Sequence, residues 1–190
     1  NKDQLKYFST IINDESKRLT RLLDEILDLS FLESGQVKLN ISNLRLNEIL
    51  QTALQSTQQS IANSNALLEF DVNFTNTKIQ TDPDRLSQVF INLITNAVKY
   101  NDKSQPTLKI SCQKDNEFLC VSFQDNGPGI PEAKHTIIFE KFTRLSNTEN
   151  SSGVGLGLAI SQEIMKNLGG SLICLESKLG ANFQVKIPLN

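Results

Sequence analysis

Residues 125–130 read Asp-Asn-Gly-Pro-Gly-Ile, and residues 153–158 read Gly-Val-Gly-Leu-Gly-Leu. Glycine lets the backbone adopt positive φ or pass close to a ligand, so both stretches are candidates for ligand-binding loops. The second stretch continues into a helical pattern, and the free N–H groups at the start of a helix attract phosphate. The first stretch places the carboxylate of Asp125 at the end of an alternating apolar run. Together they predict a bound nucleotide, with its base at Asp125 and its phosphates at residues 153–157.

A helical pattern upstream of these loops carries two amides on one face. Asn92 and Asn96 are four residues apart, and Lys99 and Tyr100 follow about one turn later. An amide oxygen is a suitable ligand for Mg²⁺, and a lysine complements the charge of phosphate. This face is therefore a candidate for holding a metal and phosphates. The alternative is a polar helix face in water, and the residues alone leave both interpretations open.

The composition limits the class of protein. A chain of 190 residues, 38% hydrophobic and 21% charged, suffices for one large domain or for one domain with an appendage. A net charge of −2 gives no electrostatic reason to expect nucleic acid as a partner. No run approaches 18 apolar residues, and the first residues do not open a signal peptide, so neither a membrane span nor a secretion signal is predicted.

Three cysteines lie in apolar, strand-like runs and lack the spacing of metal ligands: Cys112, Cys120 and Cys174. We expect them to be buried and reduced, as in a reducing compartment. A disulfide between Cys112 and Cys120 across neighbouring strands is the less favoured alternative.

The N-terminal part is predicted to be one long helix over residues 3–33. Its apolar residues alternate three and four apart, with one gap at Glu15, at Leu5, Phe8, Ile12, Leu19, Leu22, Ile26 and Leu29. Gly35 is the expected C-cap. Such a helix spans about 45 Å. Because a small domain cannot cover that length, we expect the helix to pack against another chain.

The remaining residues predict an α+β fold. Helices are expected over 46–61, with Asn43 or Asn47 as the cap, over 83–99, with Asp82 as the cap, and over 156–167. Strands are expected over 37–41, 68–72, 78–81, 107–111, 118–123, 171–176 and 182–188. This order favours a two-layer α/β sandwich, with one mixed or antiparallel sheet and helices on one face, after a long coiled-coil-like helix.

Four motifs now resemble the N, G1, F and G2 boxes of sensor histidine kinases, in that family's order and spacing. They are Asn92-x-x-x-Asn96-Ala97-x-Lys99-Tyr100, the stretch 125–130, Phe139-Glu140-x-Phe142, and Gly153-x-Gly155-Leu156-Gly157-Leu158. The resemblance implies that residues 37–190 form the catalytic ATP-binding domain, of the Bergerat type. It also implies that residues 1–36 are the C-terminal helix of an incomplete dimerisation and histidine-phosphotransfer domain.

The resemblance assigns a role to each matching position. Asn96 would ligate Mg²⁺, with Asn92 near the phosphates, and Lys99 would contact phosphate. Tyr100 would flank the base or ribose. Asp125 would accept a hydrogen bond from the adenine amino group, although it could also be a mere turn former.

The loops receive roles in the same way. Residues 131–152 would be a lid over the nucleotide, held by apolar contacts of Phe139 and Phe142, and Arg144 would reach the γ-phosphate. Alternatively, the two phenylalanines are ordinary core residues and Arg144 is a solvated loop charge. The backbone beside the base and around the phosphates would come from the G1 and G2 boxes, at Gly127, Gly129, Ile130, Gly153, Gly155, Leu156, Gly157 and Leu158.

Two departures from the family qualify this interpretation. The single histidine, His135, falls in the lid region, where we expect it to be solvent-exposed, so the phosphoacceptor histidine and its helix are absent from this chain. The final glycine box reads Gly180-Ala181-Asn182-Phe183, and it keeps only one glycine and the phenylalanine. We expect that difference to leave the nucleotide contacts untouched.

Asn92 also distinguishes kinase from hydrolase. Related ATPases place a glutamate there as the general base for water, and an amide cannot take a proton, so slow hydrolysis is expected. The resemblance implies transfer of the γ-phosphoryl group of Mg-ATP to a histidine outside this chain and then to a response regulator receiver domain. It also implies a homodimer through the N-terminal helix and a cytoplasmic location, possibly within a membrane-anchored sensor. The alternatives are an anti-sigma-type serine kinase and a nucleotide-regulated pseudokinase scaffold.

Overall fold

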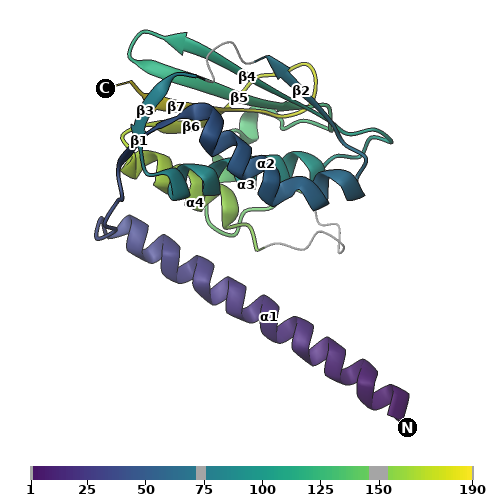
Figure 1. Ribbon diagram of the computed structural model, residues 1–190. Coiled ribbons are helices and arrows are strands. Elements are labelled where there is room, and N and C mark those ends of the chain that lie inside the picture. The colour runs from purple at the N-terminus through teal and green to yellow at the C-terminus, as the bar shows by residue number, and fades with distance from the viewer. Residues whose placement is uncertain (1, 72–75, 146–153, 190) are drawn as a thin grey trace.

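The computed structural model describes residues 2–71, 76–145 and 154–189, and it places a mixed sheet over a layer of helices (Figure 1). Helices α2, α3 and α4 cover one face of the sheet, and α1 projects away from them (Figure 1). The helices are α1 (Lys2–Glu33), α2 (Leu46–Asn63), α3 (Pro83–Lys99) and α4 (Gly157–Asn167), with 3₁₀ turns at Glu132–Lys134 and Ile137–Phe139. The strands are β1 (Ser42–Arg45), β2 (Leu67–Asp71), β3 (Lys78–Thr81), β4 (Thr107–Asp115), β5 (Phe118–Asp125), β6 (Ser171–Leu175) and β7 (Asn182–Pro188).

The main sheet has five strands in the order β2-β4-β5-β7-β6. β2 runs parallel to β4 and the other neighbours are antiparallel, so the predicted α+β fold with a mixed sheet is confirmed. The expectation of a single sheet is wrong in one respect, because β1 and β3 form a separate antiparallel pair.

The strand predicted over residues 37–41 is absent, and the strand in this region is β1. The backbone N–H of Asn40 donates to Oδ2 of Asp82 (2.8 Å), so this segment is fastened to the start of α3 instead of joining a ladder. The caps predicted for α2 are also wrong. Arg45 is the N-cap and makes no side-chain capping bond, and the N–H of Leu46 donates instead to the carbonyl of Thr77 (3.1 Å).

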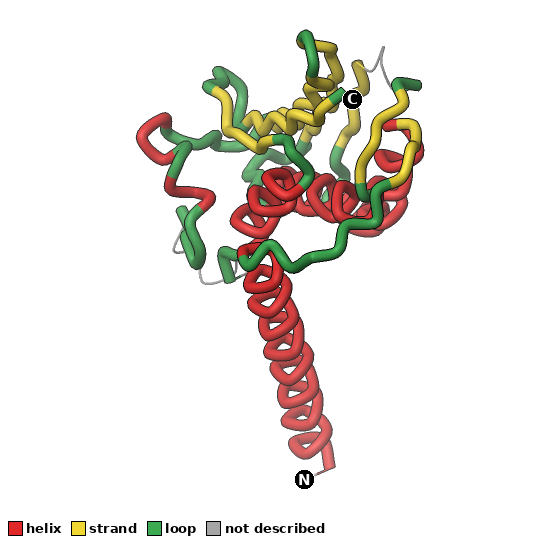
Figure 2. Tube along the Cα trace, turned by 90° about the vertical axis from the view of Figure 1, so that its left-hand side faces the viewer, coloured by secondary structure: helices red, strands yellow, loops and turns green. Residues whose placement is uncertain are grey.

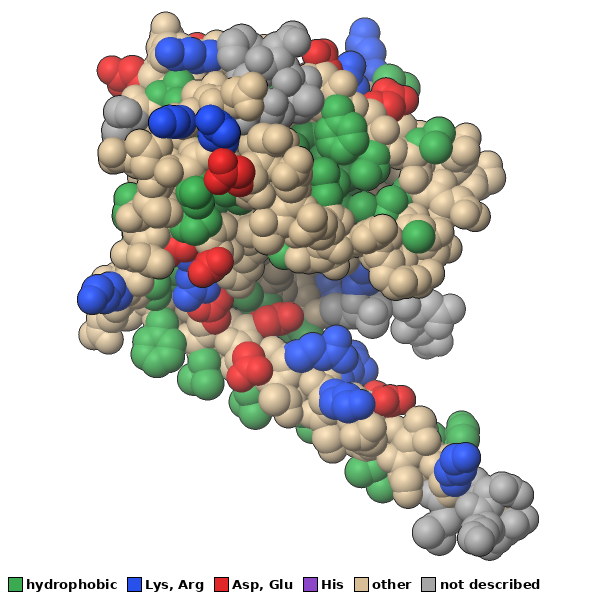
Figure 3. Space-filling model, in the orientation of Figure 1, with side chains coloured by type: hydrophobic (Ala, Val, Ile, Leu, Met, Phe, Trp, Pro, Cys, Tyr) green, Lys and Arg blue, Asp and Glu red, His purple; other side chains and the backbone are tan. Residues whose placement is uncertain are grey.

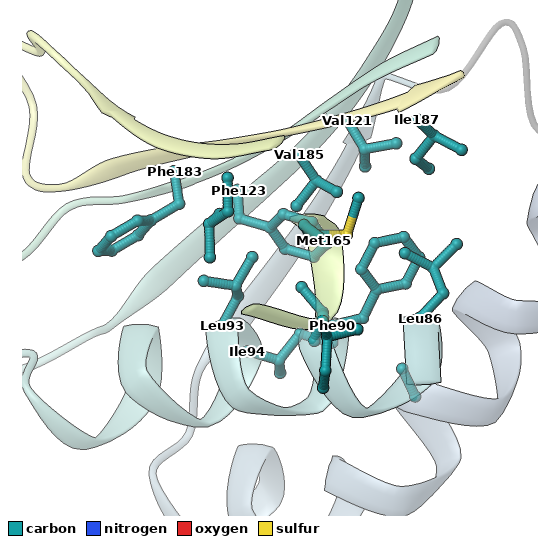
Figure 4. Close-up of a cluster of buried hydrophobic side chains, with 14 of the residues drawn as sticks. Leu86, Phe90, Leu93, Ile94, Val121, Phe123, Met165, Phe183, Val185 and Ile187 are labelled. Atoms are coloured by element: carbon teal, nitrogen blue, oxygen red, sulfur yellow. The ribbon is translucent and has the colours of Figure 1, made fainter. Parts of the chain in front are cut away.

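Helix α3 is the centre of the helical layer, and its start confirms the sequence prediction. Oδ1 of Asp82 accepts from the N–H groups of Asp84 and Arg85, both at 3.1 Å, and Pro83 occupies the first turn. One face of α3 is buried against the sheet, where the ring of Phe90 lies 5.2 Å from that of Phe123 (Figure 4). This packing fixes the helix, so its remaining side chains have defined positions.

The cysteines are free, as expected, and Cys112 and Cys120 are buried, but Cys174 is only half-buried. Cys112 pairs with Val121 and Cys120 pairs with Gln113 on the neighbouring strand. Since side chains alternate along a strand, the two thiols belong to opposite faces of the sheet, which excludes the alternative disulfide. Burial raises the pKa of the Cys112 and Cys174 thiols to about 11, so both stay protonated at neutral pH.

The last turns of α1 are joined to the sheet domain. Leu29 and Leu32 are buried, and Asp28 forms an ion pair with Arg85 of α3 (2.8 Å). Glu33 forms a second ion pair, with Lys141 in the loop after the second 3₁₀ turn (2.7 Å). The helix ends as predicted, where the N–H of Gly35 donates to the carbonyl of Leu32 (3.2 Å).

The rest of α1 extends away from the domain, which is also evident from the side (Figure 2). Its side chains form an exposed apolar stripe, visible in Figure 3, of Phe8, Ile11, Ile12, Leu19, Leu23, Ile26, Leu27 and Phe31. An uncovered stripe of this size is typical of a surface that another helix covers. Among the described residues, no helix is long and apolar enough to cross a bilayer.

Candidate nucleotide-binding site

Asp125 ends β5 and is held by backbone groups on two sides. Its Oδ1 accepts from the N–H groups of Gly127 (2.8 Å) and Ala181 (3.0 Å). Within the described part of the chain, Oδ2 has no hydrogen-bond partner, so this oxygen is available to a ligand. Burial raises the pKa of Asp125, and the two amide bonds partly oppose the rise. The carboxylate is therefore a fixed, partly desolvated acceptor and more than a turn former.

The final glycine box contacts this carboxylate, which the sequence analysis did not foresee. Gly180 has a φ of +74°, and a Cβ at that position would collide with the backbone oxygen and with Oδ1 of Asp125. Its neighbour Ala181 supplies one of the two amides that hold Oδ1. The box therefore contributes to holding the carboxylate that we predict to contact the base. The single glycine that the sequence keeps there was the signal that could have indicated the contact.

Helices α3 and α4 meet at Asn92. Its Nδ2 donates to Oγ of Ser161 on α4 (2.9 Å), and its Oδ1 lies 3.5 Å from Nδ2 of Asn96. A Cβ added to Gly157, the first residue of α4, would lie 2.5 Å from Oδ1 of Asn92. Both asparagines are half-buried, so the face is not simply a polar surface in water. Ser161 was not among the predicted site residues, because no motif marks it.

The start of α4 is open to an anion. Leu156 occupies the N-cap position without a side-chain capping bond, and the first turn holds no acidic residue. The N–H groups of this turn therefore keep their hydrogen-bonding capacity. The side chain of Leu156 is buried in the core, so this residue can contact a ligand only through its backbone. Leu158 is half-buried and packs against the core.

The C-terminal end of α3 carries Lys99 and Tyr100. Nζ of Lys99 lies 5.0 Å from the centroid of the Tyr100 ring, and Tyr100 is 43% exposed. Asn92 and Tyr100 are separated along the helix by about 12 Å. The helix thus leads from the start of α4 to the loop that follows Asp125, where Asn101 contacts Asn126.

Of the two phenylalanines predicted to hold a lid, only one is buried. Phe139 is 8% exposed and packs edge-on against Phe183, with ring centroids 6.3 Å apart. Phe142 is 58% exposed, so it does not hold the lid by apolar contact. Its φ is +63°, and its N–H donates to the carbonyl of Gly155 (2.9 Å), so the backbone of this turn is what joins the lid to the glycine loop.

The structure describes two of the three remaining predicted residues, His135 and Arg144. His135 is half-buried instead of solvent-exposed, because a ring nitrogen lies 2.9 Å from the carbonyl oxygen of Ile130 and so forms a hydrogen bond. Arg144 is exposed near the end of the described part of the lid. Gly153 lies outside the described residues.

Residues 81–190 match the family of histidine kinase-, DNA gyrase B- and HSP90-like ATPases. The chain belongs to this ATPase family. The match contains α3, Asp125, the lid and α4, which are the elements that form the candidate site. ATP is therefore the nucleotide that the family membership indicates for it.

The relatives of this ATPase domain are histidine kinases. The circadian input-output histidine kinase CikA of Synechococcus elongatus is 32% identical over 93% of the chain, but the match spans only 24% of CikA. The solved histidine kinase AdeS of Acinetobacter baumannii is 27% identical with a TM-score of 0.78, covering 96% of the chain and 84% of the solved chain. Histidine kinase ThkA, solved in complex with response regulator protein TrrA, is 26% identical with a TM-score of 0.77, covering 98% of the chain and 52% of the solved chain.

Proposed function

We propose that the protein is the ATP-binding catalytic region of a sensor histidine kinase, with residues 37–190 as the ATP-binding domain. Residues 1–36 would be the last helix of a dimerisation and phosphotransfer domain. The observation that carries the proposal is the placement of two features along the C-terminal half of α3. The free oxygen of Asp125 lies near the C-terminal end of this helix, and the open start of α4 lies beside Asn92, near the middle of the helix.

The base end favours adenine. Oδ2 of Asp125 can accept from the amino group of adenine, whereas the carbonyl oxygen of guanine at the equivalent position has no hydrogen to donate. Gly127, Gly129 and Ile130 would line the base through their backbone, and Tyr100 would flank it or the ribose.

The phosphate end uses backbone amides and cations. The start of α4 with Gly155 and Gly157 would hold the phosphates, and Gly153 would extend that loop. Lys99 and Arg144 would neutralise the charge that develops on the transferred group, while Asn92 would orient it. Because an amide at Asn92 cannot act as a general base, we expect transfer to another segment and little hydrolysis.

Magnesium fits the residues at this end. Oδ1 of Asn96 has no hydrogen-bond partner in the described part of the chain, so it is available as a hard oxygen ligand. The described residues hold no cluster of three or more acidic, histidine or cysteine side chains that would form a complete metal site. One protein oxygen together with phosphate oxygens is a usual arrangement for Mg²⁺, which would neutralise phosphate charge.

We expect an Asn96→Ala variant to lose most of the magnesium-dependent gain in ATP affinity, because the amide oxygen is the proposed protein ligand of the metal. Titration calorimetry with ATP, in the presence of magnesium and of a chelator, measures this gain. Asn96→Asp is the matched control, since its carboxylate keeps an oxygen at the same position. An alanine variant with the full magnesium effect would refute the metal assignment.

The phosphoacceptor would lie outside this chain. The single histidine, His135, is bonded to the Ile130 carbonyl within the lid, away from any long helix. The acceptor histidine would belong to a preceding helix of the same or a partner subunit, and the exposed stripe of α1 would join that dimeric bundle. A response regulator receiver domain would then take the phosphoryl group, as the ThkA–TrrA complex suggests. We place this reaction in the cytoplasm.

Incubation of the full-length protein with radiolabelled ATP tests the proposal. We expect a label on the protein that is labile in acid and stable in base, which is characteristic of phosphohistidine. An Asp125→Ala protein should remain unlabelled under the same conditions. A label stable in acid would instead identify a serine kinase, and ATP binding without any label would identify a nucleotide-regulated scaffold.

A further inference from the structure

We infer that Asn126 is a positioning residue that fixes the orientation of the Asp125 carboxylate and thereby sets the selectivity for adenine. The inference rests on the proposed function, and it concerns a residue that lies beside the base contact without forming it. Its side chain points to the segment that follows α3, and this segment comes from a different part of the chain.

The side-chain amide of Asn126 has all of its hydrogen-bonding capacity in use. Oδ1 accepts from Nδ2 of Asn101 (2.8 Å) and from the backbone N–H of Thr107 (2.9 Å). Nδ2 donates to the carbonyl of Gln105 (3.1 Å) and to Oγ1 of Thr107 (3.3 Å). An amide offers two acceptor sites and two donors, so these four bonds satisfy it completely. A side chain bound at four points has one orientation, and its backbone is fixed with it.

These bonds hold the base loop from the side opposite to Gly180 and Ala181. The final glycine box fastens Oδ1 of Asp125, while Asn126 fastens the next residue of the loop to the 101–107 segment. Without the second attachment, the peptide between Asp125 and Gly127 could rotate about the first. Oδ2 of Asp125 would then move relative to a base held elsewhere.

The same bonds also set the width of the base site. Asn101 follows Tyr100 directly, and a Cβ at Gly127 would lie 3.5 Å from Cα of Asn101. The Asn101–Asn126 bond therefore sets the spacing between the acceptor loop and the end of α3 that carries Tyr100. Discrimination between an amino group and a carbonyl oxygen needs an acceptor at a fixed place, because a mobile loop could turn a backbone N–H toward guanine instead.

The test compares the affinities for ATP and GTP in two variants, Asn126→Ala and the milder Asn101→Ala. The second variant keeps both bonds between Asn126 and Thr107. We expect Asn126→Ala to bind ATP about tenfold more weakly, as for the loss of an ordinary hydrogen-bonded anchor, with little change for GTP. Asn101→Ala should change the ratio of the two affinities in the same direction, by about threefold. Asn116→Ala is the matched control, since Asn116 occupies the turn at the far end of β5 and should leave the ratio unchanged.

A purely structural role for Asn126 would lower the melting temperature without altering the ratio of ATP to GTP affinity. An unchanged ratio in folded Asn126→Ala and Asn101→Ala proteins would therefore overturn the inference while leaving the proposed function intact. If the parent protein bound neither nucleotide, the proposed function would fail first. Should Asn126→Ala not fold, Asn101→Ala decides the result, because it removes one of the four bonds of Asn126 and, besides that, only the exposed bond from the N–H of Lys103.

Discussion

An Asp125→Asn protein is expected to bind ATP about a hundredfold more weakly than the parent, which corresponds to the loss of a hydrogen bond to a charged group. The asparagine can keep an oxygen at the position of Oδ1, where the N–H groups of Gly127 and Ala181 require an acceptor. Its NH₂ group must then occupy the position of Oδ2. There it would face the amino group of adenine, so a donor would meet a donor.

The same substitution should raise the affinity for GTP relative to that for ATP. The new NH₂ group can donate to the carbonyl oxygen of guanine, which the carboxylate could not bind. Calorimetric titration with both nucleotides measures the two affinities, and thermal unfolding shows that the fold is kept. Asp115→Asn, at the other end of the β4–β5 hairpin, is the control for the change in charge. Unaltered ATP binding by Asp125→Asn would remove the base contact from the proposal.

Elements with local signals were predictable from the sequence. Helix α3 was predicted with its bounds because an N-cap, a proline in the first turn and an apolar face of helical period all lie within the helix itself. The segment 37–41 alternates like a strand, and the structure explains why that signal misleads. Its extended backbone is held by the side chain of Asp82. The local sequence does not specify whether an extended segment pairs with another strand.

Within the candidate site, the residues in glycine-rich or amide motifs were predictable, and their partners were not. Ala181 bonds to Asp125 from 56 residues away, because the antiparallel register of β5 and β7 brings the start of β7 beside the end of β5. Ser161 reaches Asn92 from 69 residues away. Phe142 has an exposed side chain, and its backbone N–H donates to the carbonyl of Gly155. Each of these contacts depends on packing between elements, which motif spacing does not record.

A Gly157→Ala protein is expected to lose the contribution of the phosphates while still binding adenosine. The added Cβ would lie 2.5 Å from Oδ1 and 3.1 Å from Cγ of Asn92, so either Asn92 or the first turn of α4 must move. The movement would misalign the N–H groups that we propose for the phosphates. We expect ATP affinity to fall by about a hundredfold, because charge-assisted bonds to phosphate are strong and depend on geometry.

Thermal unfolding of the variant separates this loss from a loss of stability, because the added Cβ must displace Asn92 or the first turn of α4. Comparison of ATP with adenosine by calorimetry separates the two ends of the site. Asp125→Asn should lower the affinity for both ligands, whereas Gly157→Ala should lower only the affinity for ATP. Ser161→Ala is the informative companion, since it frees Asn92 without adding bulk, and a smaller loss of ATP affinity is expected from it. If Gly157→Ala weakened adenosine as much as ATP, the start of α4 would not be a phosphate site, and the two-ended arrangement on α3 would have to be abandoned.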